Sequence, residues 1–161
     1  MSMTVTYVVE TPIGDLAVSF SEKGLASIEV ASENVPVTTQ AGAPFDGWFA
    51  TVKKGLKAYF AGKPLTFPEV PIDEQGTDFQ KAVWAVLRSI PYGKTLTYGE
   101  VAERVGGRSK SRAVGGACNK NPLLLYTPCH RVVGADKSLT GFACGVERKA
   151  ELLALEAKHA K

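Results

Sequence analysis

The chain has 161 residues, of which 45% are hydrophobic and 22% charged, and its formal net charge is +3. This composition is typical of a globular protein with one full domain or two small ones. We expect no membrane segment and a cytoplasmic location, because no apolar run approaches about 18 residues and the N-terminus lacks a signal pattern. Three cysteines and two histidines without metal-ligand spacing argue against a disulfide framework and a structural zinc site.

The charge is distributed unevenly along the chain. Residues 1–76 hold five Lys/Arg and nine Asp/Glu, a net charge of −4, whereas residues 77–161 hold 14 and seven, a net charge of +7. Two interpretations are open. A polyanionic partner contacts the second half, or the difference is ordinary variation of surface charge.

The first half has the pattern of a small sheet with one helix. Residues 4–30 contain β-branched and alternating apolar positions with turn signals between the runs, and they predict an antiparallel meander. Large apolar side chains then recur at helical spacing over residues 45–60, which predicts a helix with one wide buried face. Residues 67–72 are a candidate further strand, interrupted by two prolines.

The second half is predominantly helical. We place the boundary at residues 73–76, which divides the chain into domains 1–75 and 76–161. Thr77 with Gln80 fits a capping box at the start of a helix, and Thr97 with Glu100 fits a second one.

A helix-turn-helix candidate follows the second capping box. The turn is Gly106-Gly107-Arg108-Ser109, and Ser109 is the candidate cap of a helix over residues 110–119. That helix combines basic residues with glycines, each of which costs roughly 1 kcal/mol of helix stability relative to alanine. Something must therefore approach its surface closely, either another helix or a nucleic-acid backbone.

The last predicted helix covers residues 146–158. Its apolar stripe, which we expect to be the buried face, consists of Val146, Ala150, Leu153 and Ala157. Glu156 lies beside this stripe. A carboxylate in that place is either solvated or turned inward to orient an imidazole.

A cysteine and a histidine stand side by side in Pro128-Cys129-His130-Arg131. A thiol with a reference pKa of about 8.5 is mostly protonated at neutral pH, and a neighbouring imidazole raises its thiolate fraction. Adjacent side chains on a strand point to opposite faces, so contact between Cys129 and His130 needs a local bend or a bridging water. The alternative is a buried structural cysteine beside a buried histidine.

Several motifs resemble the O6-alkylguanine-DNA alkyltransferase family. They cover residues 76–158 densely, at positions 76–80, 83–84, 90–93, 98–102, 111–117, 121–122 and 128–132. The first half agrees only in its length, strand pattern and aromatic helix. The resemblance implies an α+β fold, in which a small ribonuclease-H-like α/β domain precedes a mostly helical, helix-turn-helix (winged-helix-like) alkyltransferase domain.

The resemblance also implies an activity, direct-reversal DNA repair. The alkyl group of O6-alkylguanine, and also of O4-alkylthymine, would pass to Cys129 in a single turnover. His130 would take the thiol proton through a water, Glu156 would orient the imidazole, and Tyr98 would supply the donor at N3 of the departing guanine. The implied partner is double-stranded DNA carrying O6-alkylguanine, bound by a monomer without metal or organic cofactor.

The family pattern assigns further residues by position. The expected substrate-binding residues are Asn121, Val132, Phe142, Ala143 and Cys144. The expected DNA-binding residues are Lys110, Ser111, Arg112, Ala113, Gly115, Gly116 and Arg131. Arg112 would enter the base stack when the target nucleotide is flipped out, with the helix in the minor groove. Phe142 and Ala143 replace the family's frequent Tyr and Ser, and Cys144 a frequent glycine.

Three other functions are less well supported by the residues. A relative that only binds the lesion would lack the acceptor cysteine, which is present here as Cys129. A helix-turn-helix regulator would need base-discriminating side chains where residues 110–119 offer Ala and Gly. A cysteine hydrolase would need an oxyanion hole, and beyond the Cys-His pair nothing in the sequence indicates one.

Overall fold

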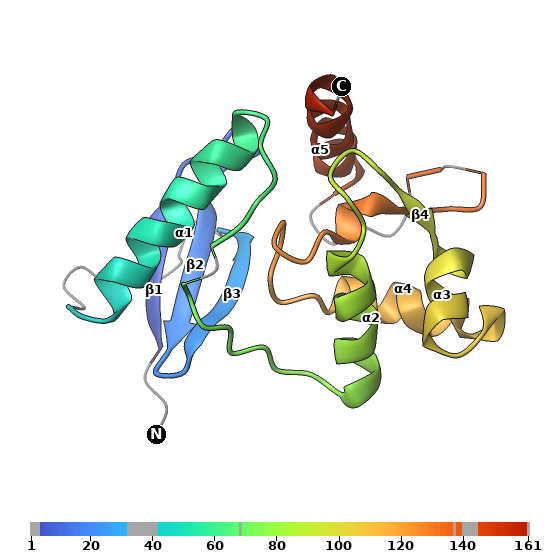
Figure 1. Ribbon diagram of the computed structural model, residues 1–161, viewed down its shortest axis with the longest axis horizontal. Coiled ribbons are helices and arrows are strands. Elements are labelled where there is room, and N and C mark those ends of the chain that lie inside the picture. The colour runs from blue at the N-terminus through green and yellow to red at the C-terminus, as the bar shows by residue number, and fades with distance from the viewer. Residues whose placement is uncertain (1–3, 32–41, 68, 137, 140–144, 161) are drawn as a thin grey trace. The chain divides into compact units, whose positions relative to one another are not determined.

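The computed structural model describes residues 4–31, 42–67, 69–136, 138–139 and 145–160. The chain forms two compact units, Met1–Gln75 and Gly76–Lys161. The first unit is a small sheet with a helix and the second is mostly helical, which confirms the expected α+β class (Figure 1). Within the described ranges, no helix is long and apolar enough to cross a membrane.

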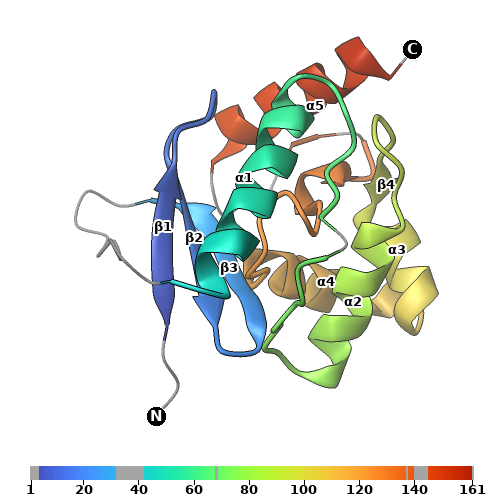
Figure 2. The same cartoon turned by 60° about the vertical axis from the view of Figure 1, so that its left-hand side comes forward.

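The first unit contains the predicted antiparallel meander. Strands β1 (Val5–Val9), β2 (Leu16–Ser21) and β3 (Gly24–Val30) pair in that order. Helix α1 (Phe45–Phe60) lies across one face of this sheet in both views (Figures 1 and 2). Its buried residues recur along one stripe, as amphipathic packing requires, and are Phe45, Val52, Leu56 and Tyr59.

Residues 67–72 do not form the further strand that their composition allowed. In the described part of this segment, a single parallel bridge joins Ile72 to Leu25 of β3. The Leu25 N–H donates to the Pro71 carbonyl at 2.8 Å, and the Asp73 N–H donates to the Leu25 carbonyl at 2.8 Å. Proline has no N–H to extend the ladder, which limits pairing to this short stretch.

The second unit is built from four helices and two short strands among the residues described. In chain order these are α2 (Asp78–Arg88), β4 (Leu96–Thr97), α3 (Tyr98–Val105), α4 (Ser111–Asn119), β5 (Val132–Val133) and α5 (Val146–His159). Both predicted capping boxes are confirmed, because the side chains of Thr77 and Thr97 each accept from the third helical N–H and the Gln80 and Glu100 side chains reach back.

The start of α4 differs from the prediction. Ser109 does not cap this helix, because it lies within a 3-10 turn over Arg108–Lys110, and α4 begins at Ser111 without a side-chain cap. The helix is held instead by packing. The Trp84 indole N–H of α2 donates to the Ala117 carbonyl at 2.9 Å, and Val114 and Ala117 are buried.

Helix α5 buries a different face from the one that its apolar residues predict. Val146 is 46% exposed, and Ala150 and Ala157 are exposed as well. The buried residues are Lys149, Leu152 and Glu156, which lie three and four positions apart and so share one face. The predicted stripe was therefore wrong, because two charged residues occupy the inner face of this helix.

Removal of the α2 cap should measurably destabilise the second unit. Thr77→Ala takes away the acceptor for the Gln80 N–H, and we expect the free energy of unfolding to fall by about 1 kcal/mol in urea denaturation. Ser89→Ala, at the other end of the same helix, is the control. The Ser89 hydroxyl donates to the Val86 carbonyl, which already accepts the Ser89 N–H. Equal losses in the two variants would contradict the capping role of Thr77.

Candidate active site

Cys129, His130 and Arg131 form one 3-10 turn that leads directly into β5. The turn begins after Pro128, and the Arg131 N–H donates to the Pro128 carbonyl at 3.0 Å. It provides the bend that contact between Cys129 and His130 requires. Cys129 is 6% exposed and His130 is completely buried, so both groups are largely removed from bulk water.

The loop that precedes this turn is braced by Asn121. The Asn121 side-chain amide donates to the Thr127 carbonyl at 2.8 Å, and its oxygen accepts the Leu123 N–H at 2.9 Å. Arg88 of α2 donates to the Thr127 hydroxyl at 2.8 Å, and the Cys129 N–H donates to the Thr127 carbonyl at 2.8 Å. Two side chains thus hold the residue immediately before Pro128.

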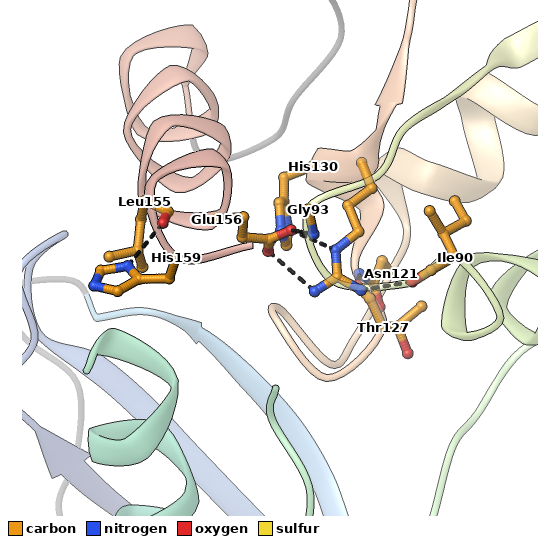
Figure 3. A network of polar contacts seen from close by, with 9 residues as sticks. Ile90, Gly93, Asn121, Thr127, His130, Leu155, Glu156 and His159 are labelled. Atoms are coloured by element: carbon orange, nitrogen blue, oxygen red, sulfur yellow. Dashed lines mark hydrogen bonds and ion pairs between the residues drawn. The ribbon is translucent and has the colours of Figure 1, made fainter. Parts of the chain in front are cut away.

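A single carboxylate, that of Glu156 on α5, joins three segments of the second unit. It meets the Nε2 atom of His130 at 2.5 Å and accepts two hydrogen bonds from the Arg131 guanidinium at 2.7 and 3.0 Å. Figure 3 shows the Glu156 carboxylate turned from α5 toward His130. The Arg131 guanidinium donates a third hydrogen bond, to the Ile90 carbonyl at 2.7 Å. Glu156 is 1% exposed, which settles the open alternative in favour of an inward-facing carboxylate.

Gly93 supplies a further donor to the same carboxylate. Its N–H lies 3.1 Å from Oε1 of Glu156, in the turn between α2 and β4. Its φ of +82° is a left-handed conformation that glycine adopts readily, and a Cβ at this position would lie 2.4 Å from the Cβ of Ala160. A larger residue would therefore strain the backbone and push the end of α5 away from the turn.

The hydrogen bonds indicate the protonation state of His130. Because Nε2 donates to the Glu156 carboxylate, the lone pair belongs to the buried Nδ1 atom, which is the nitrogen able to accept a proton. Burial lowers the pKa of His130 and outweighs the opposing effect of Glu156, while the positive charges of Arg131 and Lys149 lower it further. The imidazole is thus a neutral and weak base.

Tyr98 is positioned by the short parallel sheet. It follows β4 directly, and β4 pairs with β5 through Leu96–Val132 and Thr97–Val133, so the first turn of α3 is fixed beside the Cys129–Arg131 turn. The Tyr98 ring lies 5.8 Å from the Nζ atom of Lys149. Lys149 is completely buried and was not singled out by the sequence analysis. The signal that could have found it is its place seven residues before Glu156, two turns along the same face.

The predicted substrate and DNA residues other than Asn121 and those at α4 fall into three groups. Phe142, Ala143 and Cys144 lie outside the described residues. Val132 is buried in β5, within the same short sheet that positions Tyr98. Arg131 does not fit its expected place at the DNA surface, because it is 7% exposed and its guanidinium is bonded to Glu156 and Ile90.

The outer face of α4 is exposed. Lys110, Arg112, Ala113 and Gly116 are exposed, and Ser111 and Gly115 are partly exposed. A Cβ added at Gly115 or Gly116 would meet no atom within 4 Å. In the described part of the second unit, no other helix therefore takes up the close approach that the two glycines permit.

Comparisons with known proteins agree over nearly the whole chain. Family models match the DNA-binding domain of 6-O-methylguanine DNA methyltransferase at residues 78–158 and its ribonuclease-like domain at residues 4–74. A methylated-DNA–protein-cysteine methyltransferase of Methanosarcina acetivorans is 41% identical over 153 residues, 91% of this chain and 94% of that protein.

Two crystal structures from Mycobacterium tuberculosis are similar in fold and sequence. O6-methylguanine methyltransferase is 38% identical, with a TM-score of 0.84, covering 99% of this chain and 96% of that chain. OGT in complex with DNA is 38% identical, with a TM-score of 0.82, covering 96% of this chain and 93% of that chain. The chain belongs to the O6-methylguanine DNA methyltransferase family, which confirms the family resemblance read from its motifs.

The lowered pKa of His130 should make folding stability depend on pH. The unfolded imidazole binds a proton below about pH 6.5, whereas the folded one resists protonation, so the unfolded chain holds more protons. The free energy of unfolding should therefore fall as the pH drops below about 6.5, by at most about 1.4 kcal/mol per pH unit from this group.

His159, the other histidine of the chain, serves as the control for His130. His130→Gln should flatten this dependence, and His159→Gln, on the exposed end of α5, should preserve it. The imidazole signals of the unaltered protein, followed by NMR across the same pH range, give an independent check. Titration of His130 at or above about pH 6.5 would contradict the shift.

Proposed function

We propose that this chain repairs alkylated DNA by moving the alkyl group of O6-alkylguanine onto the Cys129 thiol, once per molecule. The observation that carries the proposal is the linked arrangement of Cys129, His130 and Glu156 in the buried turn and the facing helix. The family to which the chain belongs is a family of DNA methyltransferases, and its relatives are named for a protein cysteine as acceptor.

The reaction begins at the thiol of Cys129. Its proton passes to Nδ1 of His130 through a bridging water, and Glu156 holds the ring so that this nitrogen carries the lone pair. The sulfur attacks the alkyl carbon, the new S–C bond forms, and the C–O6 bond breaks with its electron pair moving into the guanine. A proton at N3, donated by the Tyr98 hydroxyl, leaves neutral guanine in the DNA. The tyrosinate regains a proton through solvent, so that in net the proton of the thiol replaces the one given to guanine.

The product explains the single turnover. The sulfur of a thioether has no good leaving group for water to displace, so the alkyl group stays on Cys129 and the thiol is not regenerated. O4-alkylthymine presents the same kind of O-alkyl carbon, and we include it as a second substrate. Apart from the bridging water, the groups used in these steps belong to the protein or the DNA.

Access to the thiol requires the nucleotide to leave the duplex. The O6 atom of a stacked guanine cannot reach the sulfur of Cys129, a residue that is only 6% exposed. Extrusion of the base costs a few kcal/mol, less for a damaged base. We infer that α4 lies in the minor groove with its exposed face against the DNA backbone. Arg112, which is exposed near the start of α4, would then fill the space that the flipped base leaves in the stack. The DNA complex of the Mycobacterium tuberculosis relative supports this choice of partner.

The decisive test of the proposed function is whether a methyl group is transferred to Cys129. After mixing with a duplex that carries one O6-methylguanine, the intact protein should gain the mass of one methyl group, mapped to Cys129 by peptide analysis. Cys129→Ser should bind the duplex without gaining mass, because serine is a far weaker nucleophile near neutral pH.

Two other outcomes lead to different functions. Tight binding to the lesion without mass gain would favour a protein that only marks damage. Binding that depends on the surrounding sequence and ignores the lesion would favour a helix-turn-helix regulator.

Cys118 is the internal control for mapping, since burial raises the pKa of its thiol to about 12 and keeps it protonated.

Substitutions on α4 should separate DNA binding from folding. Gly116→Ala should stabilise the second unit by up to about 1 kcal/mol, because the added Cβ meets no protein atom, and should weaken binding to undamaged duplex at fixed salt. Gly47→Ala, at an equally open position in α1, should leave duplex binding unchanged.

Arg112→Ala tests base extrusion on the same helix. We expect slower methyl transfer from duplex DNA, with transfer from a single-stranded oligonucleotide changed much less, because a single strand does not pay for unstacking a paired base. Equal slowing on both substrates would show that Arg112 serves general backbone binding instead.

A further inference from the structure

The segment before Cys129 contains a tight and unusual turn. The Tyr126 N–H donates to the Leu124 carbonyl at 2.9 Å, which closes a three-residue turn around Leu125. The φ of Leu125 is +73°, and among the described residues no other side-chain-bearing residue has a positive φ. A γ-turn with a positive φ at its centre is the rare and strained form, and leucine lacks the freedom of glycine to adopt it.

A second γ-turn leads directly into Cys129. The Cys129 N–H donates to the Thr127 carbonyl at 2.8 Å, around Pro128 with φ −80° and ψ 69°. These angles are those of the common inverse γ-turn. Because Thr127 lies between the two γ-turns, a shift of Thr127 is passed on to the backbone of Cys129.

Strained backbone persists only where its surroundings hold it in place. Asn121 bonds to the Thr127 carbonyl and to the Leu123 N–H, but it belongs to the same loop. Arg88 stands in the last turn of α2, and its Nη1 donates to the Thr127 hydroxyl at 2.8 Å across 39 positions. The bond from Arg88 therefore fixes the loop against a helix.

The Arg88 guanidinium contacts both γ-turns. Thr127 is completely buried, where a hydroxyl deprived of its partner would be costly. The guanidinium carbon lies 5.8 Å from the centre of the Tyr126 ring, whose N–H closes the first turn. The C-terminal end of α2 also favours a cation at this place, because its carbonyl groups point toward the charge.

The chain on the other side of Cys129 is tied to the same region. The Arg131 guanidinium donates to the carbonyl of Ile90, just beyond the end of α2, at 2.7 Å. One arginine bond thus precedes the acceptor residue and one follows it. Together they set the place of Cys129 relative to the end of α2.

We propose that Arg88 is a positioning residue for alkyl transfer, which acts through the Thr127 hydroxyl and the two γ-turns to aim the Cys129 sulfur at the alkyl carbon. This inference rests on the proposed function. Displacement at carbon needs the sulfur opposite the departing oxygen, and a misplacement of about 1 Å can slow a reaction about a hundred-fold.

The test removes the hydrogen bond from either side. Thr127→Val deletes the hydroxyl and keeps the branched shape, Thr127→Ser keeps the hydroxyl, and Arg88→Met deletes the donor. Thr51→Val is the matched control for the hydroxyl, since Thr51 donates to the Gly47 carbonyl in α1 at 3.1 Å. Arg104→Met is the control for the charge, because Arg104 is an exposed arginine in the last turn of α3.

The first readout is single-turnover methyl transfer from an O6-methylguanine duplex, with the maximal rate and the half-saturating duplex concentration determined separately. Thr127→Val and Arg88→Met should lower the maximal rate at least about ten-fold and leave the half-saturating concentration nearly unchanged. Thr127→Ser and the two controls should keep the maximal rate of the unaltered protein. A maximal rate that Arg88→Met leaves unchanged would overturn the proposal, even if Thr127→Val fails to fold.

The double variant tests whether Arg88 acts through Thr127. Arg88→Met combined with Thr127→Val should be no slower than the slower single variant, because both substitutions remove the same hydrogen bond. Losses that multiply, for example two ten-fold losses giving about a hundred-fold, would show independent roles and would overturn the proposed path through the hydroxyl.

Amide hydrogen exchange without DNA is the second readout. The Tyr126 and Cys129 N–H groups close the two γ-turns, so in Arg88→Met and Thr127→Val they should exchange at least about ten-fold faster relative to the Trp84 amide of α2. Equal acceleration of all three amides would assign the effect to lost stability and overturn the positioning role. Absence of methyl transfer in the unaltered protein would reject the proposed function, while the exchange rates would still show whether Arg88 holds the turns.

Discussion

The second unit depends on the burial of one carboxylate. Glu156 is removed from water, and an unpaired ion in that position would cost several kcal/mol. Its charge is compensated by Arg131, His130 and the Gly93 N–H, which reach it from two different segments. The same bonds that make its burial possible therefore hold the Cys129–Arg131 turn, the turn after α2 and the C-terminal helix in one arrangement. The contacts that fix the geometry of the site are therefore the same ones that stabilise the second unit.

The features that the sequence predicted well are local ones. Both capping boxes and the meander are encoded within a few residues, by a threonine three positions before a Gln or Glu and by β-branched runs between turns. The link between His130 and Glu156 spans 26 positions, and no periodicity could have placed the two together. It was expected only because the motifs resembled a family. The roles assigned to Phe142, Ala143 and Cys144 remain predictions.

The sequence predictions that were wrong concern charged residues whose side chains are buried. Hydrophobic periodicity treats lysine, arginine and glutamate as outward-facing, so it placed the buried face of α5 on the wrong side. The family pattern placed Arg131 at the DNA surface, although its side chain is buried. Arg131 and Glu156 turn inward because they satisfy one another, which a residue-by-residue scale does not represent. Local rules fail first at functional sites, and a charged residue on the buried face of a helix is itself a sign of such a site.

The weak basicity of His130 has a consequence for the kind of molecule this is. An enzyme that turns over must restore its general base in every cycle, so its histidine has to bind and release protons near the working pH. A buried imidazole with a lowered pKa is poorly suited to that cycle. It is sufficient for the proposed single transfer, in which the base accepts one proton and never has to be restored. In this respect the proposed site resembles a reagent that is used once more than a catalyst.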